Sequence, residues 1–282
     1  MKKCLILTFL LLLPFFSVAA GEQKLYEIPG TQVIPIQDPQ SGGQYELYVK
    51  LPEKYADDSE KHYPVIYFTD AVWQIELLSA STAFLMEEVI LVGISWQKDI
   101  DEKLKNEVGA HVSRFRDYSI TQSSDPVKQA KYQFGQASHH LAFIRNHVIQ
   151  HVEKNYRTKP ESRTYFGFSL GGLFGAYILL SEPDTFKNYI LGSPSVWQLA
   201  ELESKADLKR KSLNANLFIS HGNLETKLSK HINDFIAVLK NRNDETLSLT
   251  PVVIEGSHQT AFPMTGIRSV NWLANLQQAE DK

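Results

Sequence analysis

Short apolar runs alternate along this 282-residue chain with longer stretches whose apolar residues recur at helical spacing. The apolar runs lie at 64–70, 88–94, 164–166, 188–192, 217–220 and 247–254. Those at 64–70 and 88–94 lack a polar alternation, as expected of strands buried on both faces of a sheet. The helical stretches lie at 71–86, 137–156, 173–180, 227–241 and around 267–276. This alternation predicts right-handed crossovers and a mostly parallel sheet with helices on both faces.

Two earlier segments have a different pattern. Residues 31–37 and 45–51 alternate apolar and polar positions around the turn-forming stretch 38–43. This pattern predicts an antiparallel hairpin at the edge of the sheet. The chain shows no internal repeat and no low-complexity linker, so we expect residues 21–282 to form one α/β domain.

The first 20 residues have the layout of a secretory signal. Lys2 and Lys3 precede an apolar run, and Ser17–Ala20 supplies small residues for cleavage. The run is short for a membrane span, although an uncleaved anchor is the alternative. We therefore expect a periplasmic or secreted protein with no membrane contact after cleavage. Cys4, the only cysteine, would leave with the signal, which excludes disulfides and cysteine hydrolases.

Composition and charge exclude few other classes. The chain is 43% hydrophobic and 22% charged, an ordinary globular composition, and its net charge is −3. Nothing in this charge balance suggests a nucleic-acid partner.

Residues 163–172, R-T-Y-F-G-F-S-L-G-G, predict a strand, a sharp turn and a helix. Within them, Gly167-Phe168-Ser169-Leu170-Gly171 is a G-x-S-x-G, the pattern of a nucleophile elbow. Such an elbow lifts its serine into solvent and needs small neighbours, because strand and helix backbones pass close to each other. The alternative is a glycine-rich turn with an incidental serine.

A serine nucleophile needs a base, and the base needs an orienting acid. Reactive side chains gather at the carboxyl ends of parallel strands. His258 follows the strand 247–254 and is the candidate base, while Glu225 follows the strand 217–220 and is the candidate acid. The order serine, acid, histidine is that of an α/β-hydrolase. His221 and Asp234 are weaker alternatives for base and acid.

An oxyanion site requires two backbone N–H groups. We expect one from Leu170, directly after the nucleophile, and the other from Ala71, after the strand that ends at Asp70.

Histidines 140, 147 and 151 recur at helical spacing, but no Glu follows the first of them as in H-E-x-x-H. We therefore expect a polar helix border there rather than a metal site. No pattern in the chain requires a cofactor.

Residues 98–136 are polar and poorly periodic, so a lid or rim of the site is one interpretation and a solvated loop is the other. The segment contains R-F-R-D-Y-S at 114–119, whose arginines could meet an anionic substrate.

The chain resembles the esterase D and siderophore-esterase group of α/β-hydrolases, which includes feruloyl-type esterases and mycolyltransferases. The matching motifs are Y-P-V-I-Y at 63–67, R-F-R-D-Y at 114–118, Y-R-T at 156–158, R-T-Y-F-G-F-S-L-G-G-L-F at 163–174, S-P-S-V-W at 193–197 and G-S-H at 256–258. The resemblance implies the same roles for Ser169, Glu225 and His258. The family usually has Asp-Gly where this chain has Asp70-Ala71, and Ala71 can serve only if it does not need a positive φ.

The resemblance implies a serine ester hydrolase acting through an acyl-enzyme on a small-molecule ester. A catecholate siderophore trilactone is the preferred substrate, with Arg114, Arg116 and Trp197 placed to flank a catecholate. General carboxyl, feruloyl or acyl esters, acyl transfer, and a catalytically silent binding protein are the alternatives.

Overall fold

The computed structural model describes residues 26–204 and 212–280, and the predicted signal at 1–20 lies outside these ranges. The described strands form one eight-stranded sheet in the order β1-β2-β4-β3-β5-β6-β7-β8. Their bounds are β1 (Thr31–Gln37), β2 (Gln44–Lys50), β3 (Tyr63–Phe68), β4 (Ile90–Ile94), β5 (Thr158–Phe168), β6 (Asn188–Gly192), β7 (Ala215–Gly222) and β8 (Leu247–Ile254).

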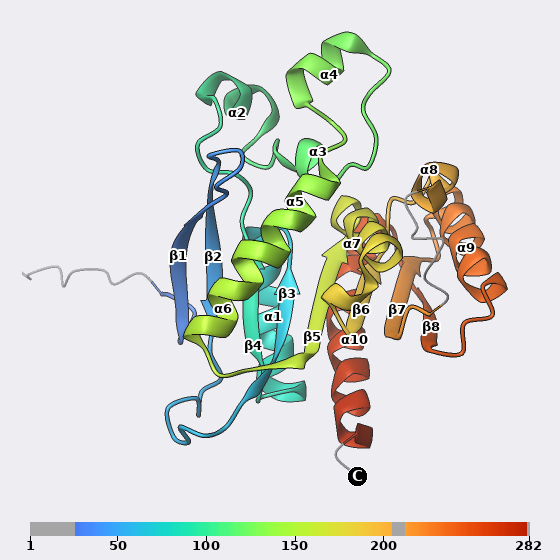
Figure 1. The fold of residues 1–282 in the computed structure, drawn as a ribbon. Helices are drawn as coiled ribbons and strands as arrows, with labels where there is room; N and C mark the ends of the chain where they lie inside the picture. Colours follow the sequence, from blue (N-terminus) through green and yellow to red (C-terminus); the bar gives the residue numbers. More distant parts are fainter. Residues whose placement is uncertain (1–25, 205–211, 281–282) are drawn as a thin grey trace, which may run out of the picture.

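The sheet confirms the predicted α/β fold and its edge hairpin. β1 pairs antiparallel with β2, and β2 pairs antiparallel with β4. The pairs from β4 through β3, β5, β6 and β7 to β8 are all parallel. The carboxyl ends of these parallel strands therefore meet at one edge, which lies toward the top of Figure 1.

Helices cover both faces of the sheet (Figure 1). The α-helices are α1 (Ala71–Leu85), α2 (Glu102–Val108), α3 (Arg114–Asp117), α4 (Pro126–Tyr132), α5 (Ala137–Phe143), α6 (Gln150–Asn155), α7 (Leu170–Ser181), α8 (Leu199–Ser204), α9 (Thr226–Asn241) and α10 (His258–Glu280). A π-helical segment, η1 (Ile144–Ile149), joins α5 to α6, and a short 3-10 turn, η2 (Pro183–Thr185), follows α7.

Alternation along the buried strands divides the core into two layers. In β3, Val65 and Tyr67 pack into the layer that contains Phe174 of α7, while Ile66 and Phe68 pack into the layer that contains α1 and α10. Because successive strand side chains point to opposite faces, an unbroken apolar run is needed to fill both layers.

Residues 98–136 are more regular than the sequence indicated, since α2, α3 and α4 all lie within them. Helices α2 and α4 bury no residue, so they have no apolar stripe to detect. Each is instead capped locally, because Asp101 accepts from the Leu104 N–H and Asp125 from the Val127 and Lys128 N–H groups.

The last helix also differs from its prediction, because α10 begins at His258, well before residue 267. Its early turns include Gly266 and the internal Pro263, which lower helix propensity. Within the described ranges, no helix combines the length and apolar character needed to cross a bilayer.

Candidate active site

Ser169 occupies a strained turn between β5 and α7. Its backbone has φ 58° and ψ −114°, and its N–H donates to the Gly192 carbonyl at 2.8 Å. A Cβ on Gly167 would lie 2.3 Å from the carbonyl oxygen of Gly171. The close passage of strand and helix backbones therefore requires the small residues of G-x-S-x-G, as predicted.

Glu225 and His258 are joined at the carboxyl edge of the sheet. Glu225 lies between β7 and α9, and its Oε1 is 2.5 Å from Nδ1 of His258, the first residue of α10. Its Oε2 accepts from the Ser193 hydroxyl at 2.7 Å and the Gly222 N–H at 2.5 Å. Burial raises the pKa of Glu225, but these hydrogen bonds outweigh it and lower the pKa below its ordinary value.

The imidazole of His258 lies beside the elbow. Its ring packs against Phe168, the residue before Ser169, with ring centroids 5.0 Å apart. The Ser169 hydroxyl is 3.5 Å from the Ser195 hydroxyl. Among the residues described, Ser169 and His258 do not share a hydrogen bond. In enzymes without substrate, the hydrogen bond between nucleophile and base is often long and tightens when substrate binds.

Leu170 and Ala71, the two expected oxyanion donors, each open a helix. The first N–H groups of a helix have no intrahelical partner, so both are free to meet a developing negative charge. The left-handed residue at the second position is Asp70, with φ 57°, and Ala71 is not among the positive-φ residues. The condition set from sequence for alanine at this position is therefore met.

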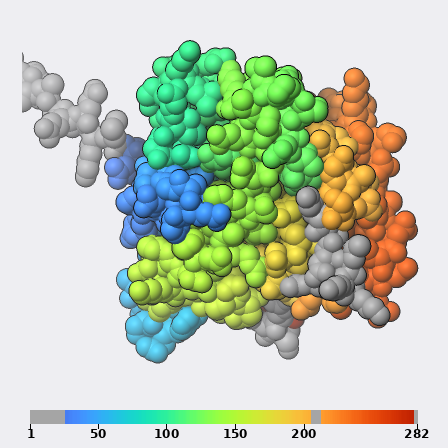
Figure 2. Space-filling view, turned by 45° about the horizontal axis from the view of Figure 1, so that its top comes forward, coloured from blue at the N-terminus to red at the C-terminus, as the bar shows by residue number. Residues whose placement is uncertain are grey.

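A cleft of about 440 Å³ opens beside Ser169. Residues 98–136 form one wall, and the segment after β6, which includes Trp197, forms another. Thr121 bridges the two walls by donating to Gln198 at 3.1 Å. Figure 2 shows the green surface of residues near 130 beside the orange surface near 200, on the side that carries this edge of the sheet. Phe115, Phe134 and Trp197 give the cleft an aromatic lining.

The structure separates the two arginines of the 114–119 motif. Arg114 lines the cleft, but its guanidinium is paired with Asp70. Arg116 pairs with Asp117 and donates to the Tyr45 hydroxyl at 3.0 Å, in a different cavity of about 280 Å³. Sequence alone missed this separation because neighbouring positions of one short helix point in different directions.

The two weaker alternatives do not contact Ser169 or the Glu225–His258 pair through their side chains among the residues described. Asp234 is paired with Lys230 on the exposed side of α9. His221 is buried in β7 and contacts the Gly222 carbonyl.

The three helical histidines do not form the polar helix border expected from sequence. His140 is buried among aromatic rings, while His147 is exposed. No cluster of three metal-ligating side chains occurs within residues 26–204 and 212–280.

Three polar residues at the site had no role assigned to them from sequence. Ser193 fixes Glu225, Ser195 approaches Ser169, and Asp70 holds Arg114. Their position in the chain was the signal that could have identified them. Each lies within three residues of the carboxyl end of a parallel strand, where site residues gather.

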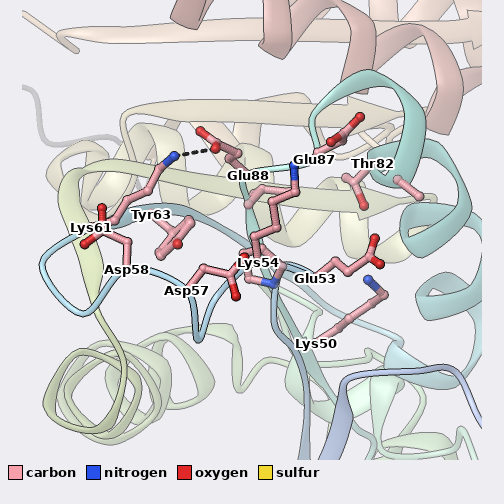
Figure 3. A pocket seen from close by; sticks show the side chains of 13 residues that line it. Lys50, Glu53, Lys54, Asp57, Asp58, Lys61, Tyr63, Thr82, Glu87 and Glu88 are labelled. Carbon is pink, nitrogen blue, oxygen red and sulfur yellow. Dashed lines mark hydrogen bonds and ion pairs between the residues drawn. The ribbon is translucent and has the colours of Figure 1, made fainter.

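A charged cavity of about 350 Å³ lies at the opposite edge of the sheet. Figure 3 shows Lys50, Glu53 and other charged side chains around it, with Lys61 bonded to Glu88. The cavity is lined from the end of β2, the start of β3 and the end of α1, far from the elbow. We assign it no part in the chemistry at Ser169.

Comparison with known proteins places the chain among esterases. The sequence model of the family Esterase, described as "Putative esterase", matches residues 39–276. The "Ferri-bacillibactin esterase BesA" of Bacillus subtilis (strain 168) is 26% identical over 233 residues, covering 76% of this chain and 77% of that protein. The "Siderophore triacetylfusarinine C esterase" of Aspergillus fumigatus is 27% identical over 204 residues, covering 65% of each chain.

Solved structures share the fold. The "IroE-like serine hydrolase" of Shewanella oneidensis superimposes with a TM-score of 0.72 at 22% identity, covering 87% of this chain and 80% of that one.

Proposed function

Because the chain belongs to the Esterase family and is an ester hydrolase, we propose that Ser169, His258 and Glu225 are its catalytic triad. The proposal is supported by two features that lie at the same edge of the sheet. Ser169 occupies a strained elbow, and the Glu225–His258 pair, 2.5 Å apart, packs against the residue before it.

In the first step, Oγ of Ser169 attacks the ester carbonyl carbon while Nε2 of His258 takes the hydroxyl proton. Glu225 accepts the Nδ1–H of His258, which leaves Nε2 as the acceptor and stabilises the imidazolium that forms. The oxyanion is bound by the N–H groups of Leu170 and Ala71. His258 then returns the proton to the leaving alcohol as the ester C–O bond breaks.

In the second step, water attacks the acyl-enzyme. His258 removes a proton from the water, and the bond between the acyl carbon and Oγ breaks. The proton returns to Ser169 and the carboxylic acid leaves, which restores the enzyme.

We propose a siderophore ester as the substrate, with a catecholate trilactone preferred. The support is the activity named for the relatives together with the aromatic lining of the cleft by Phe115, Phe134 and Trp197. Flat catechol rings bind well to such surfaces. Export through the signal at residues 1–20 would place the enzyme where siderophores pass.

Substrate choice is tested by comparing kcat/KM for a ferric catecholate trilactone, a feruloyl ester and a simple acyl ester. We expect the trilactone to be preferred by at least about tenfold. Preference for the feruloyl or acyl ester would leave the esterase assignment intact and remove the siderophore assignment.

The triad is tested with Ser169→Ala and with Ser181→Ala, a serine at the other end of the same helix, as the matched control. We expect Ser169→Ala to lose at least about 10⁴-fold in p-nitrophenyl ester hydrolysis, since the nucleophile is removed. The control should retain activity. Hydrolysis that survives in a folded Ser169→Ala variant would refute the assignment.

A further inference from the structure

A buried ion pair lies beneath the cleft, between Asp70 and Arg114. The Asp70 side chain is 1% exposed and accepts from Arg114 Nε at 2.6 Å and Nη2 at 3.1 Å. Its Oδ1 also accepts from the Trp96 indole N–H at 2.7 Å. Donors from two distant segments of the chain therefore converge on one carboxylate.

Asp70 also occupies a left-handed backbone conformation, with φ 57° and ψ 43°, immediately before α1. Aspartate is a favoured N-cap, yet its carboxylate makes no cap bond here. Trp96 and Arg114 hold the side chain away from the helix. This left-handed turn is costly for a residue with a Cβ, so the contacts that hold Asp70 also hold the turn.

The turn sets the direction of the Ala71 N–H. The ψ angle of Asp70 orients the peptide group that carries this N–H, which the proposed function places in the oxyanion site. An error of about 1 Å in the position of such a group costs about 100-fold in rate. The Asp70 contacts therefore bear on the chemistry without touching the substrate.

Arg114 is poorly suited to recognise an anion by charge. Its fork is occupied by Asp70, and its guanidinium lies 4.9 Å from the ring centre of Trp73 and 5.7 Å from that of Tyr118. Recognition of a carboxylate or catecholate by arginine generally uses a free fork.

We propose that Asp70 and Arg114 are positioning residues. The two hydrogen bonds between their side chains fix the left-handed turn at Asp70 and therefore the direction of the Ala71 N–H. Because Arg114 is the first residue of α3, the same bonds connect this turn to the 98–136 wall of the cleft. Arg114 does not select substrates by charge. The inference rests on the proposed function, because it needs Ala71 to be an oxyanion donor.

The test measures kcat and KM for Arg114→Lys, Arg114→Gln, Asp70→Asn and the double variant Asp70→Asn/Arg114→Gln. Two p-nitrophenyl esters are used, one with a neutral acyl chain and one whose acyl chain ends in a carboxylate. We expect kcat to fall about 10- to 100-fold for both esters, with KM little changed. The two single neutral variants should be non-additive in the double variant, because they break the same pair.

The Arg114→Lys variant distinguishes positioning from charge recognition, because lysine keeps the positive charge but cannot make the two-pronged guanidinium contact with a carboxylate. Positioning predicts that Arg114→Lys loses kcat for both esters. Charge recognition predicts that Arg114→Lys stays active and that Arg114→Gln raises KM for the anionic ester alone. The second result would overturn the inference.

Folding and the proposed function are checked separately. Arg145→Gln, which breaks an ion pair outside the cleft, is the matched control and should retain activity. Thermal unfolding by circular dichroism shows whether each variant folds, and the double variant avoids leaving a buried unpaired charge. Labelling of wild-type Ser169 by a fluorophosphonate tests the nucleophile alone. If wild type is labelled while folded Asp70 and Arg114 variants keep full kcat, the inference fails and the proposed function stands.

Discussion

At the scale of single residues, the site depends on a carboxylate that is both buried and ionised. Glu225 is 9% exposed, and three donors meet its two oxygens. Hydrogen bonds to a charged acceptor are worth about 1.5–3 kcal/mol each, which offsets the cost of burial. The same carboxylate contacts the imidazole of His258, so the stability of this edge and the chemistry proposed for it involve one group.

The lowered pKa of Glu225 makes its contribution to stability depend on pH. A carboxyl group whose pKa falls on folding stabilises the folded state above its unfolded pKa, near 4.5, and this stability is lost as the pH falls through the folded value. We expect Glu225→Gln to lower the free energy of unfolding by about 1–3 kcal/mol at pH 7. The difference in unfolding free energy between wild type and Glu225→Gln should become smaller as the pH falls below about 4.5.

Urea unfolding of both proteins from pH 7 down to pH 3 would check this. Other carboxyl groups with lowered pKa values are common to the two proteins and cancel in the difference. A gap that stays constant with pH would mean that Glu225 is not stabilised as an anion.

We expect Ser193 to affect stability and activity only through its hydrogen bond to Glu225. Its buried hydroxyl donates to Oε2 of Glu225, so Ser193→Ala leaves a charged acceptor one donor short. We expect a loss of about 1.5–3 kcal/mol in unfolding free energy and a several-fold lower kcat. Ser229→Ala, on the nearby helix α9, is the control and should change both by little. Equal effects in the two variants would show that the Ser193 contact is unimportant.

At the scale of elements, the elbow is set by how closely β5 and α7 pass. The predicted need for small residues is confirmed by Gly167, where a Cβ would meet the Gly171 carbonyl, and by Gly171, where it would lie 2.6 Å from Thr69 Oγ1. These contacts join the elbow both to its own helix and to the end of β3.

Gly167→Ala should therefore destabilise the fold by about 1–3 kcal/mol or more, because backbone atoms cannot yield as a flexible side chain does. Gly42→Ala is the matched control, since a Cβ there meets nothing within 4 Å and only its φ of 78° opposes alanine. That strain costs about 1 kcal/mol. Thermal unfolding measures both, and an equal loss in the two variants would show that crowding at the elbow is unimportant.

Some secondary-structure elements could be predicted from the sequence and others could not. Strands β6 and β8 follow from apolar runs, and the structure has both at the predicted bounds. At the elbow, β5 and α7 extend beyond the predicted strand at 164–166 and helix at 173–180. Helices α2 and α4 bury nothing, so their periodicity carries no signal. The partner of Arg114 was also hidden, because Asp70 is 44 residues away and no local pattern encodes that contact.

At the scale of the whole molecule, the fold gathers groups that are far apart in the chain. Ser169, Glu225 and His258 each follow a parallel strand, and parallel strands end at one edge. Their prediction from sequence used this topology and needed no side-chain contact. The contacts among Glu225, Ser193 and Gly222 depend on packing and became visible only in three dimensions.

The central claim is that Ser169 is a nucleophile activated at this edge, and covalent labelling tests it most directly. Wild-type protein and the Ser169→Ala, His258→Ala and Ser181→Ala variants would be treated with a fluorophosphonate, and the modified peptide located by mass spectrometry. We predict one adduct per chain on Ser169 in wild type and Ser181→Ala, none in Ser169→Ala, and labelling slowed by at least about 100-fold in His258→Ala. Wild-type protein that stays unlabelled, or carries the adduct on another residue, would contradict the account.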